Sequence, residues 1–224
     1  MVTHERWVRS YRAVASKYPT VSVYDRIADA ANFAALLEIE ALTNPRVREE
    51  AGAYRKVRPE DVVTGPGTTP IMASFAYSGP SRFCDGTYGV YYAGCEEATA
   101  VAESRYHTEA FLRATHQPSI DVDKRLYTAT IEGAFDDVRG RSMRSKLYAA
   151  APDDYGFAQR YAHRLYDRNR VDGIVYNSVR NPGGQCVAAF RPRIVSNARI
   201  RKYIQFRWDG RRITGVVDLV NLRE

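Results

Sequence analysis

The sequence predicts an α+β fold in one domain, with a split, mixed β-sheet flanked by helices. Short runs of alternating apolar and polar residues, typical of strands, are interspersed with a few segments of helical periodicity. Strict β-α-β alternation is missing and no Gly-x-Gly-x-x-Gly motif follows a strand, which argues against a doubly wound sheet. No repeat or linker divides the 224 residues, a length sufficient for one well-filled core.

The first predicted elements belong to the N-terminal third of the chain. Alternation over residues 20–27 predicts a strand that carries Arg26 near its end. A helix is expected from Asp29, where leucines recur at helical spacing. Residues 52–70 contain a Gly-Pro-Gly run and predict a long irregular crossing, a kind of segment that often contributes to a functional site.

The segment 81–107 is the most informative part of the chain. Arg82 precedes a glycine-containing turn, and residues 89–93 predict a short strand that includes Tyr92. A helix is expected to begin near the acidic pair at positions 96 and 97 and to carry Glu103 well inside. A cation, an aromatic ring and a carboxylate therefore lie on consecutive elements. Such a trio can hold a phosphorylated, positively charged substrate that carries a ring.

The C-terminal half predicts further strands and one helix. An arginine-rich helix is expected over residues 156–170, with Phe157, Tyr161 and Leu165 on its packing face. Asp209-Gly210 is a strong signal for a two-residue hairpin turn. The predicted strands are residues 125–131, 173–178, 186–190, 203–208 and 211–217.

The net charge of +7 makes nucleic-acid binding one interpretation to consider. Basic residues cluster in 139–146, 160–170 and 199–202, but no helix-turn-helix, zinc-finger or RNP signature accompanies them. The same surplus can steer an anionic small molecule or an acidic protein partner. Arginine far outnumbers lysine, which suits bidentate contacts to phosphate or carboxylate.

Localisation and redox state follow from what the sequence contains. No apolar run approaches the roughly 18 residues that a membrane span requires, and the charged N-terminus does not resemble a signal peptide. We therefore expect a cytoplasmic protein without membrane association. Cys84, Cys95 and Cys186 are odd in number and form no Cys-x-x-Cys pair, which favours free thiols over disulfides or a metal site.

Four motifs, in order, resemble the RES domain family, which is named for its arginine, glutamate and serine. They are residues 23–28 (Val-Tyr-Asp-Arg-Ile-Ala), 81–93, 97–107 and 172–180. The resemblance spans about residues 20–195. It implies that residues 1–224 form a single RES-type domain, with an N-terminal extension and a C-terminal hairpin around that core.

The resemblance carries an expected activity and site. Members of the family are NAD-degrading toxins of bacterial toxin–antitoxin pairs, with a fold similar to that of ADP-ribosylating toxins. By resemblance, Arg26, Glu103 and Ser178 are the catalytic arginine, glutamate and serine, and Arg82 and Tyr92 match further positions that bind NAD. After Arg82 the chain reads Phe-Cys-Asp-Gly, where many relatives have an aromatic residue followed by asparagine.

The side chains suit this chemistry. An arginine fork can hold the pyrophosphate of NAD, and Tyr92 can stack on the cationic nicotinamide ring. Cleavage of the N-glycosidic bond makes the ribose oxocarbenium-like, and the Glu103 carboxylate can stabilise that charge. Ser178 is expected to orient the ribose or the nicotinamide amide. NAD is the substrate, with water or inorganic phosphate as acceptor, and no metal is implied.

The expected partner is a cognate antitoxin with an Xre-type helix-turn-helix domain, which would occlude the pocket. A homodimer within the toxin–antitoxin complex is a further expectation, whereas direct nucleic-acid binding is not expected. Two alternatives stay open. A protein mono-ADP-ribosyltransferase would use the same NAD pocket, and a basic binding module would show steeply salt-dependent nucleic-acid binding without NAD consumption.

Overall fold

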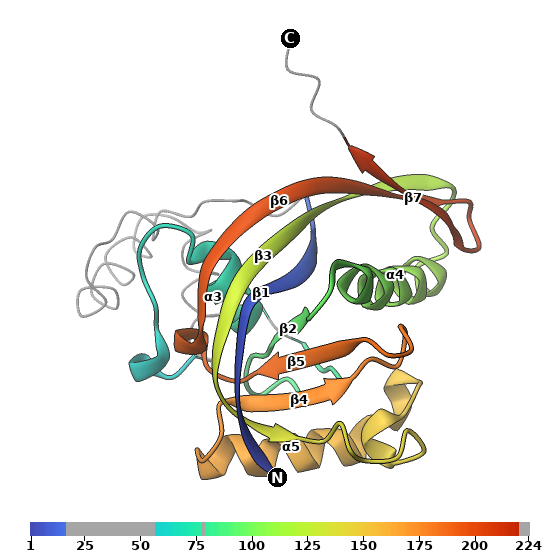
Figure 1. Ribbon diagram of the computed structural model, residues 1–224. Helices are drawn as coiled ribbons and strands as arrows, with labels where there is room; N and C mark the ends of the chain where they lie inside the picture. Colours follow the sequence, from blue (N-terminus) through green and yellow to red (C-terminus); the bar gives the residue numbers. More distant parts are fainter. Residues whose placement is uncertain (17–56, 78, 220–224) are drawn as a thin grey trace, which may run out of the picture.

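A mixed β-sheet and three helices make up the part of the chain that the computed structural model describes, residues 1–16, 57–77 and 79–219 (Figure 1). This is the α+β architecture that the sequence predicts. The elements in order are β1 (Val2–Ala15), α3 (Thr69–Ala76), β2 (Tyr91–Gly94), α4 (Glu97–Ala114), β3 (Ile120–Asp137), α5 (Gly156–Arg168), β4 (Gly173–Asn177), β5 (Gln185–Ala189), β6 (Val195–Trp208) and β7 (Ile213–Leu219). Short 3-10 turns lie at Pro59–Asp61, Lys146–Tyr148, Pro152–Asp154 and Pro192–Ile194.

The sheet has two parts that differ in strand length. The long strands β1, β3 and β6 form a curved arch, and the short strands β2, β5 and β4 cross its concave side (Figure 1). The strand order is β1-β2-β5-β4-β3-β6-β7, and β1 also pairs with β3. The described pairings therefore close into a ring of β1, β2, β5, β4 and β3. Within the ring only β3 and β4 are parallel.

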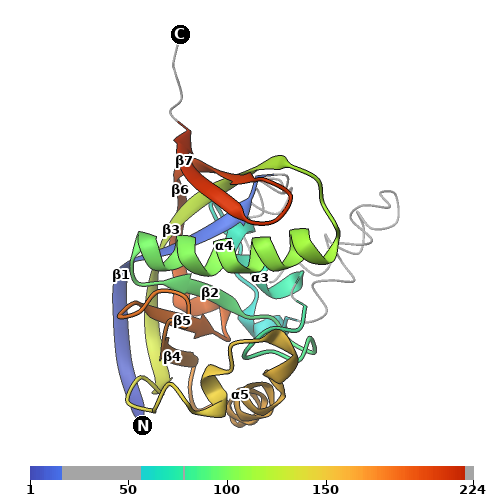
Figure 2. The same ribbon diagram turned by 90° about the vertical axis from the view of Figure 1, so that its right-hand side faces the viewer.

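Helix α4 lies on the concave side of the arch, between the β6–β7 hairpin and β2 (Figures 1 and 2). Its apolar face packs on the distal half of the arch, where Leu112 meets Phe206, Trp208 and Ile213. Helix α5 covers the other end of the molecule and packs beside β4. The sheet therefore holds α4 from two sides, and this fixes the polar face of α4 in space.

Most predicted elements of the C-terminal two-thirds are confirmed. The strand predicted at 125–131 is the central part of the longer strand β3, the strand predicted at 203–208 is the C-terminal end of β6, and the hairpin at Asp209-Gly210 joins β6 to β7. Of the packing face predicted for α5, Tyr161 and Leu165 are confirmed, because both pack against the core, and Phe157 is wrong. Ala158 and Ala162 are fully buried, whereas Phe157 is 40% exposed.

The N-terminal third differs most from expectation. Strand β1 was not expected, because a bulge between Trp7 and Ser10 interrupts the alternation that would reveal a strand. Helix α3 was not expected either. The predicted strand 20–27, with Arg26, and the helix from Asp29 lie outside the described residues. Of the predicted crossing, the described residues 57–68 form one 3-10 turn and bends.

Candidate functional site

A tight connection between β2 and α4 places the polar face of the helix. The backbone N–H of Ala100 donates to the carbonyl of Glu96, the residue that precedes the helix. Gly94 ends β2 so close to this turn that a Cβ there would lie 2.8 Å from the Ala100 nitrogen. Thr99 and Glu103, one helical turn apart, consequently face the turn that joins β4 to β5.

The structure brings Glu103 and Ser178 together. The Ser178 hydroxyl donates to Glu103 Oε1 at 2.6 Å and accepts from the backbone N–H groups of Arg180 and Asn181, at 3.1 and 2.9 Å. A serine hydroxyl has one hydrogen and two lone pairs, so its hydrogen-bonding capacity is fully used. Ser178 is only 3% exposed. These bonds support a positioning role for Ser178 rather than contact with a substrate.

A second contact fixes the same turn on α4. Asn181 Nδ2 donates to Thr99 Oγ1 at 2.9 Å, one helical turn before Glu103. Within the turn, the N–H of Ser178 donates to the carbonyl of Gly184 at 2.8 Å. A Cβ on Gly184 would lie 2.3 Å from Thr99 Oγ1, so this approach requires glycine. Helix and turn hold the Glu103 carboxylate in one place.

Arg82 lies nearby but is largely engaged by the protein. It is 7% exposed, and its guanidinium donates to the carbonyls of Leu147 and Ala149 at 3.2 and 2.7 Å. The same group lies 4.6 Å from the ring centroid of Tyr155. Arg82 therefore fixes the segment before α5, and its positive charge contributes to the field around Glu103.

The pKa values of neighbouring groups show that Arg82 and Glu103 share one environment. Burial lowers the pKa of His107, Glu103 opposes this shift, and Arg180 and Arg82 add to it. Burial, with a contribution from Glu103, raises the pKa of Cys186 far above its ordinary value. The Cys186 thiol is therefore protonated at neutral pH, which argues against a nucleophilic role for it.

Tyr92 presents a ring of fixed orientation. Its hydroxyl accepts from the backbone N–H of Phe83 at 2.9 Å and shares a hydrogen bond of 2.8 Å with Ser81. Burial raises the pKa of this hydroxyl well above its usual range. Because these partners flank Arg82 in sequence, the predicted cation and ring belong to one local unit.

Arg12 is a candidate that sequence reasoning missed. Its guanidinium donates to the carbonyl of Tyr92 at 2.8 Å and lies 4.9 Å from the ring centroid of Tyr91. Its buried Nε has no hydrogen-bond partner among the residues that the structure describes. No carboxylate in the described part of the chain pairs with the guanidinium. Burial lowers the pKa of Arg12, because it disfavours the charged form. A half-buried cation with an unused Nε donor suits an anionic ligand.

Arg180 and Tyr106 also lie at the site. The guanidinium carbon of Arg180 is 3.3 Å from the ring centroid of Tyr106, and both side chains donate to the Ala150 carbonyl. Both residues lie inside motifs that carried the family resemblance. That is the only sequence signal that could have identified them. Arg26, the remaining predicted site residue, lies outside the described residues.

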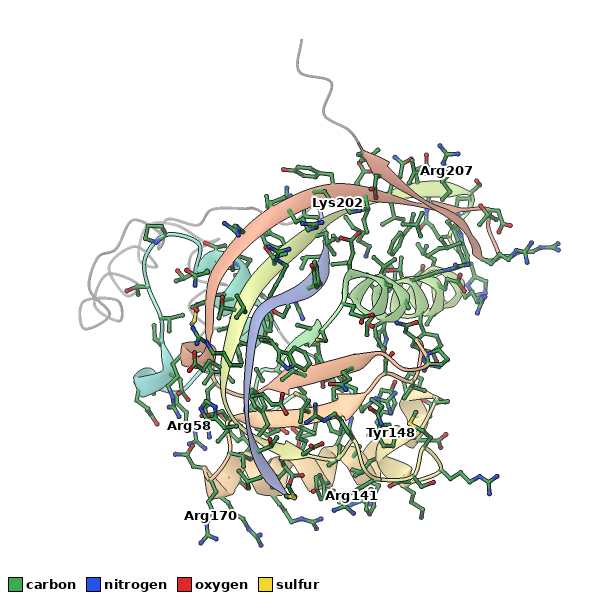
Figure 3. The ribbon with its side chains drawn as sticks, in the orientation of Figure 1. Arg58, Arg141, Tyr148, Arg170, Lys202 and Arg207 are labelled. Atoms are coloured by element: carbon green, nitrogen blue, oxygen red, sulfur yellow. The ribbon has the colours of Figure 1, made fainter. Side chains whose placement is uncertain are left out.

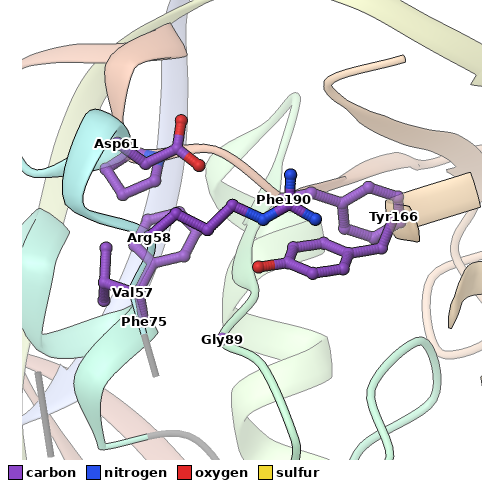
Figure 4. Close-up of a pocket in the computed structure, with 8 residues that line it drawn as sticks. Val57, Arg58, Asp61, Phe75, Gly89, Tyr166 and Phe190 are labelled. Carbon is purple, nitrogen blue, oxygen red and sulfur yellow. The ribbon is translucent and has the colours of Figure 1, made fainter. Parts of the chain in front are cut away.

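Two hollows in the described structure are not lined by any of the candidate site residues. The first, beside β5 and α5, has room for about one water, with an accessible volume of about 10 Å³ (Figure 4). Arg58 and Tyr166 line it, next to Asp61. Asp61 pairs with Arg191 and Arg193, so this hollow is a gap in a structural ion-pair cluster. The second is an open groove of about 380 Å³ beside the C-terminal end of α4.

No group of three or more histidine, cysteine, aspartate or glutamate side chains in the described part of the chain is arranged to hold a metal ion. None of the helices in that part of the chain is both long and apolar enough to cross a membrane.

Comparison with known proteins identifies relatives. The family model described as "RES domain" matches residues 57–209, a range that includes Arg82, Tyr92, Glu103 and Ser178 and leaves out Arg12 and Arg26. The chain is also 28% identical over 210 residues to "Uncharacterized protein y4oC" of Sinorhizobium fredii (strain NBRC 101917 / NGR234). That alignment covers 91% of this chain and 84% of the relative.

Proposed function

The chain belongs to the RES domain family, and from this premise we propose that it is an NAD-degrading toxin of a bacterial type II toxin–antitoxin pair. It depletes cellular NAD by cleaving the N-glycosidic bond. The observation that carries the proposal is the hydrogen bond between Ser178 and Glu103, which fixes a half-buried carboxylate at the junction of three elements. Catalysis of this cleavage requires such a preorganised negative charge.

Glu103 acts where charge develops. As the bond to nicotinamide lengthens, positive charge accumulates on the anomeric carbon and ring oxygen of the ribose. A carboxylate held beside that carbon interacts more strongly with the transition state than with ground-state NAD. Ser178 and the β4–β5 turn prevent the carboxylate from reorienting, so no reorganisation is needed during the reaction.

The remaining groups bind NAD. Tyr92 stacks on the cationic nicotinamide ring, an interaction of about 0.5–2 kcal/mol. The unused Nε donor of Arg12 favours a role in holding the pyrophosphate, together with the positive field of Arg82. Arg26, the family arginine by resemblance, stays a proposed site residue.

The finer features of the proposal rest on the family. The mixed sheet agrees with a fold similar to that of ADP-ribosylating toxins. Water or inorganic phosphate accepts the ADP-ribosyl group, giving a glycohydrolase or a phosphorylase. An Xre-type antitoxin neutralises the enzyme by covering the site, and toxin homodimers form within that complex.

Glu103→Gln tests the reaction. The glutamine oxygen still accepts from Ser178, so the fold and the positions of its neighbours are retained while the negative charge is lost. We expect nicotinamide release from NAD to fall by about 100- to 1000-fold, with and without phosphate. Glu97→Gln, the same change on the first turn of α4, is the matched control and should leave turnover unchanged. Equal turnover in wild type and Glu103→Gln would refute the proposed site.

The same assay with NAD labelled in the adenylate half distinguishes NAD degradation from protein mono-ADP-ribosylation. Free ADP-ribose or its phosphate supports NAD degradation. Label that stays on protein would instead assign the site to a protein mono-ADP-ribosyltransferase.

A further inference from the structure

The outer face of α5 carries an unusual row of charges. Arg160, Arg164 and Arg168 follow one another at spacings of four residues and are all exposed. None of them forms an ion pair with any residue in the described part of the chain. Phe157, 40% exposed, lies at the N-terminal end of the same row. An aromatic side chain followed by three unpaired arginines therefore faces solvent.

This row costs stability. Like charges four residues apart on a helix destabilise it by about 0.2–0.5 kcal/mol per pair. The acidic residue nearest the row, Asp167, does not relieve the repulsion, because it pairs with His163, which also contacts Asp85. A feature that opposes helix stability and that no ion pair among the described residues compensates suggests a role in binding a partner.

The row continues onto the neighbouring loop. The guanidinium carbon of Arg141 lies 5.8 Å from the ring centroid of Tyr161, which borders the row on α5. Arg141 and Arg170 project from the same end of the molecule as α5 (Figure 3). We call this surface the α5 basic face. Its exposed residues are Arg141, Met143, Arg144, Phe157, Arg160, Arg164, Arg168 and Arg170.

We infer that the α5 basic face is the docking surface for an acidic segment of a partner protein. Guanidinium forks bind carboxylates in a bidentate manner, which gives charge complementarity and direction. Two apolar side chains are exposed near these arginines in sequence: Phe157 (40%) precedes Arg160 on α5, and Met143 (47%) lies between Arg141 and Arg144 in the loop. Arginine, methionine and aromatic residues are the types enriched in protein–protein interfaces, whereas lysine is depleted. A surface that bound only the phosphates of a nucleic acid would not need apolar side chains beside its arginines.

The face adjoins the candidate site through the start of α5. Gln159 Nε2, on the first turns of the helix, donates to the Ser81 carbonyl, and the Tyr155 hydroxyl contacts Arg82. A partner bound to the α5 basic face therefore lies beside the segment before α5, whose Ala150 carbonyl accepts from Tyr106 and Arg180. The inference concerns binding alone and does not depend on the proposed reaction.

Two matched triple variants test the inference. The probe is a fluorescently labelled peptide of aspartate and glutamate with a central tryptophan, measured by anisotropy at low salt. Reversing Arg160, Arg164 and Arg168 to glutamate should weaken binding by about tenfold or more. The control reverses Arg199 and Arg207 on β6 and Arg212 in the β6–β7 turn, all exposed and none on α5, and changes the net charge equally. It should lose less than about twofold.

A variant that leaves the charge unchanged distinguishes a protein partner from a nucleic-acid partner. Phe157→Ala should weaken peptide binding by about fivefold, since an apolar anchor is lost without a change in charge. Duplex DNA, offered as a competing probe, should bind more weakly than the peptide. Three results would overturn the inference: no peptide binding by wild type, equal loss in both triple variants, or DNA binding tighter than the peptide and indifferent to Phe157→Ala. Thermal unfolding confirms that each variant is folded.

Discussion

Helices α4 and α5 use charged residues in opposite ways. On α4, Glu109 lies between Arg105 and Arg113 and pairs with both, at 3.4 and 3.0 Å. On α5, the equivalent central position between Arg160 and Arg168 is another arginine, Arg164. The charges of α4 are therefore balanced within the molecule, and those of α5 are available to a partner.

The polar contacts of α4 extend to both sides of the helix. Arg105 Nη2 donates to the Ile213 carbonyl at 2.5 Å, and Glu109 Oε1 accepts from the Ile213 N–H at 2.9 Å, which fixes the β6–β7 hairpin. On the other side, Thr99 and Glu103 hold the β4–β5 turn. The contrast suggests that α4 provides rigidity at the site, while α5 provides recognition at its margin.

Ser178→Ala should have the largest effect on this arrangement. The change frees the Glu103 carboxylate and leaves the partly buried N–H groups of Arg180 and Asn181 without their acceptor. We expect kcat for NAD cleavage to fall by about 100-fold, because a misplaced group loses about that much rate. The unpaired donors should lower the free energy of unfolding by about 1–3 kcal/mol.

Steady-state kinetics distinguish positioning from substrate contact at Ser178. A positioning residue predicts a loss in kcat with little change in KM, and Ser178→Thr, which keeps the hydroxyl, should retain most activity. A rise in KM at unchanged kcat would instead show that the serine contacts NAD, as the sequence resemblance suggests.

Glu109→Ala tests the ion pairs that balance the charges of α4. It removes two ion pairs of partly exposed arginines and the acceptor of the Ile213 N–H, so we expect the free energy of unfolding to fall by about 2 kcal/mol. Chemical denaturation measures this change. NAD cleavage should be affected little, because Glu109 faces the hairpin and not the β4–β5 turn. Unaltered stability would show that α4 is held by its apolar face alone.

Local signals explain which parts of this molecule the sequence predicts. Helix α4 and the β6–β7 hairpin were predicted because periodicity, an acidic start and an Asp-Gly turn are local properties. The contact of Glu103 with Ser178 joins residues 75 positions apart, and only the family resemblance suggested it. Arg12 was missed because the bulge in β1 hides the strand on which it lies. The saturated hydroxyl of Ser178 depends on backbone geometry in a turn, which no spacing rule reveals.

Arg164→Glu should give the smallest effect and the sharpest test of the contrast. It gives α5 the pattern of α4, because an acidic residue then lies four positions from Arg160 and from Arg168. Two repulsions become two attractions, partly offset by the nearby Asp167, so we expect the free energy of unfolding to rise by about 0.5 kcal/mol. Binding of the acidic peptide should fall at the same time. A variant that gains stability and loses binding shows that the charges of α5 oppose folding and favour recognition, whereas a loss of both would show that Arg164 stabilises the helix.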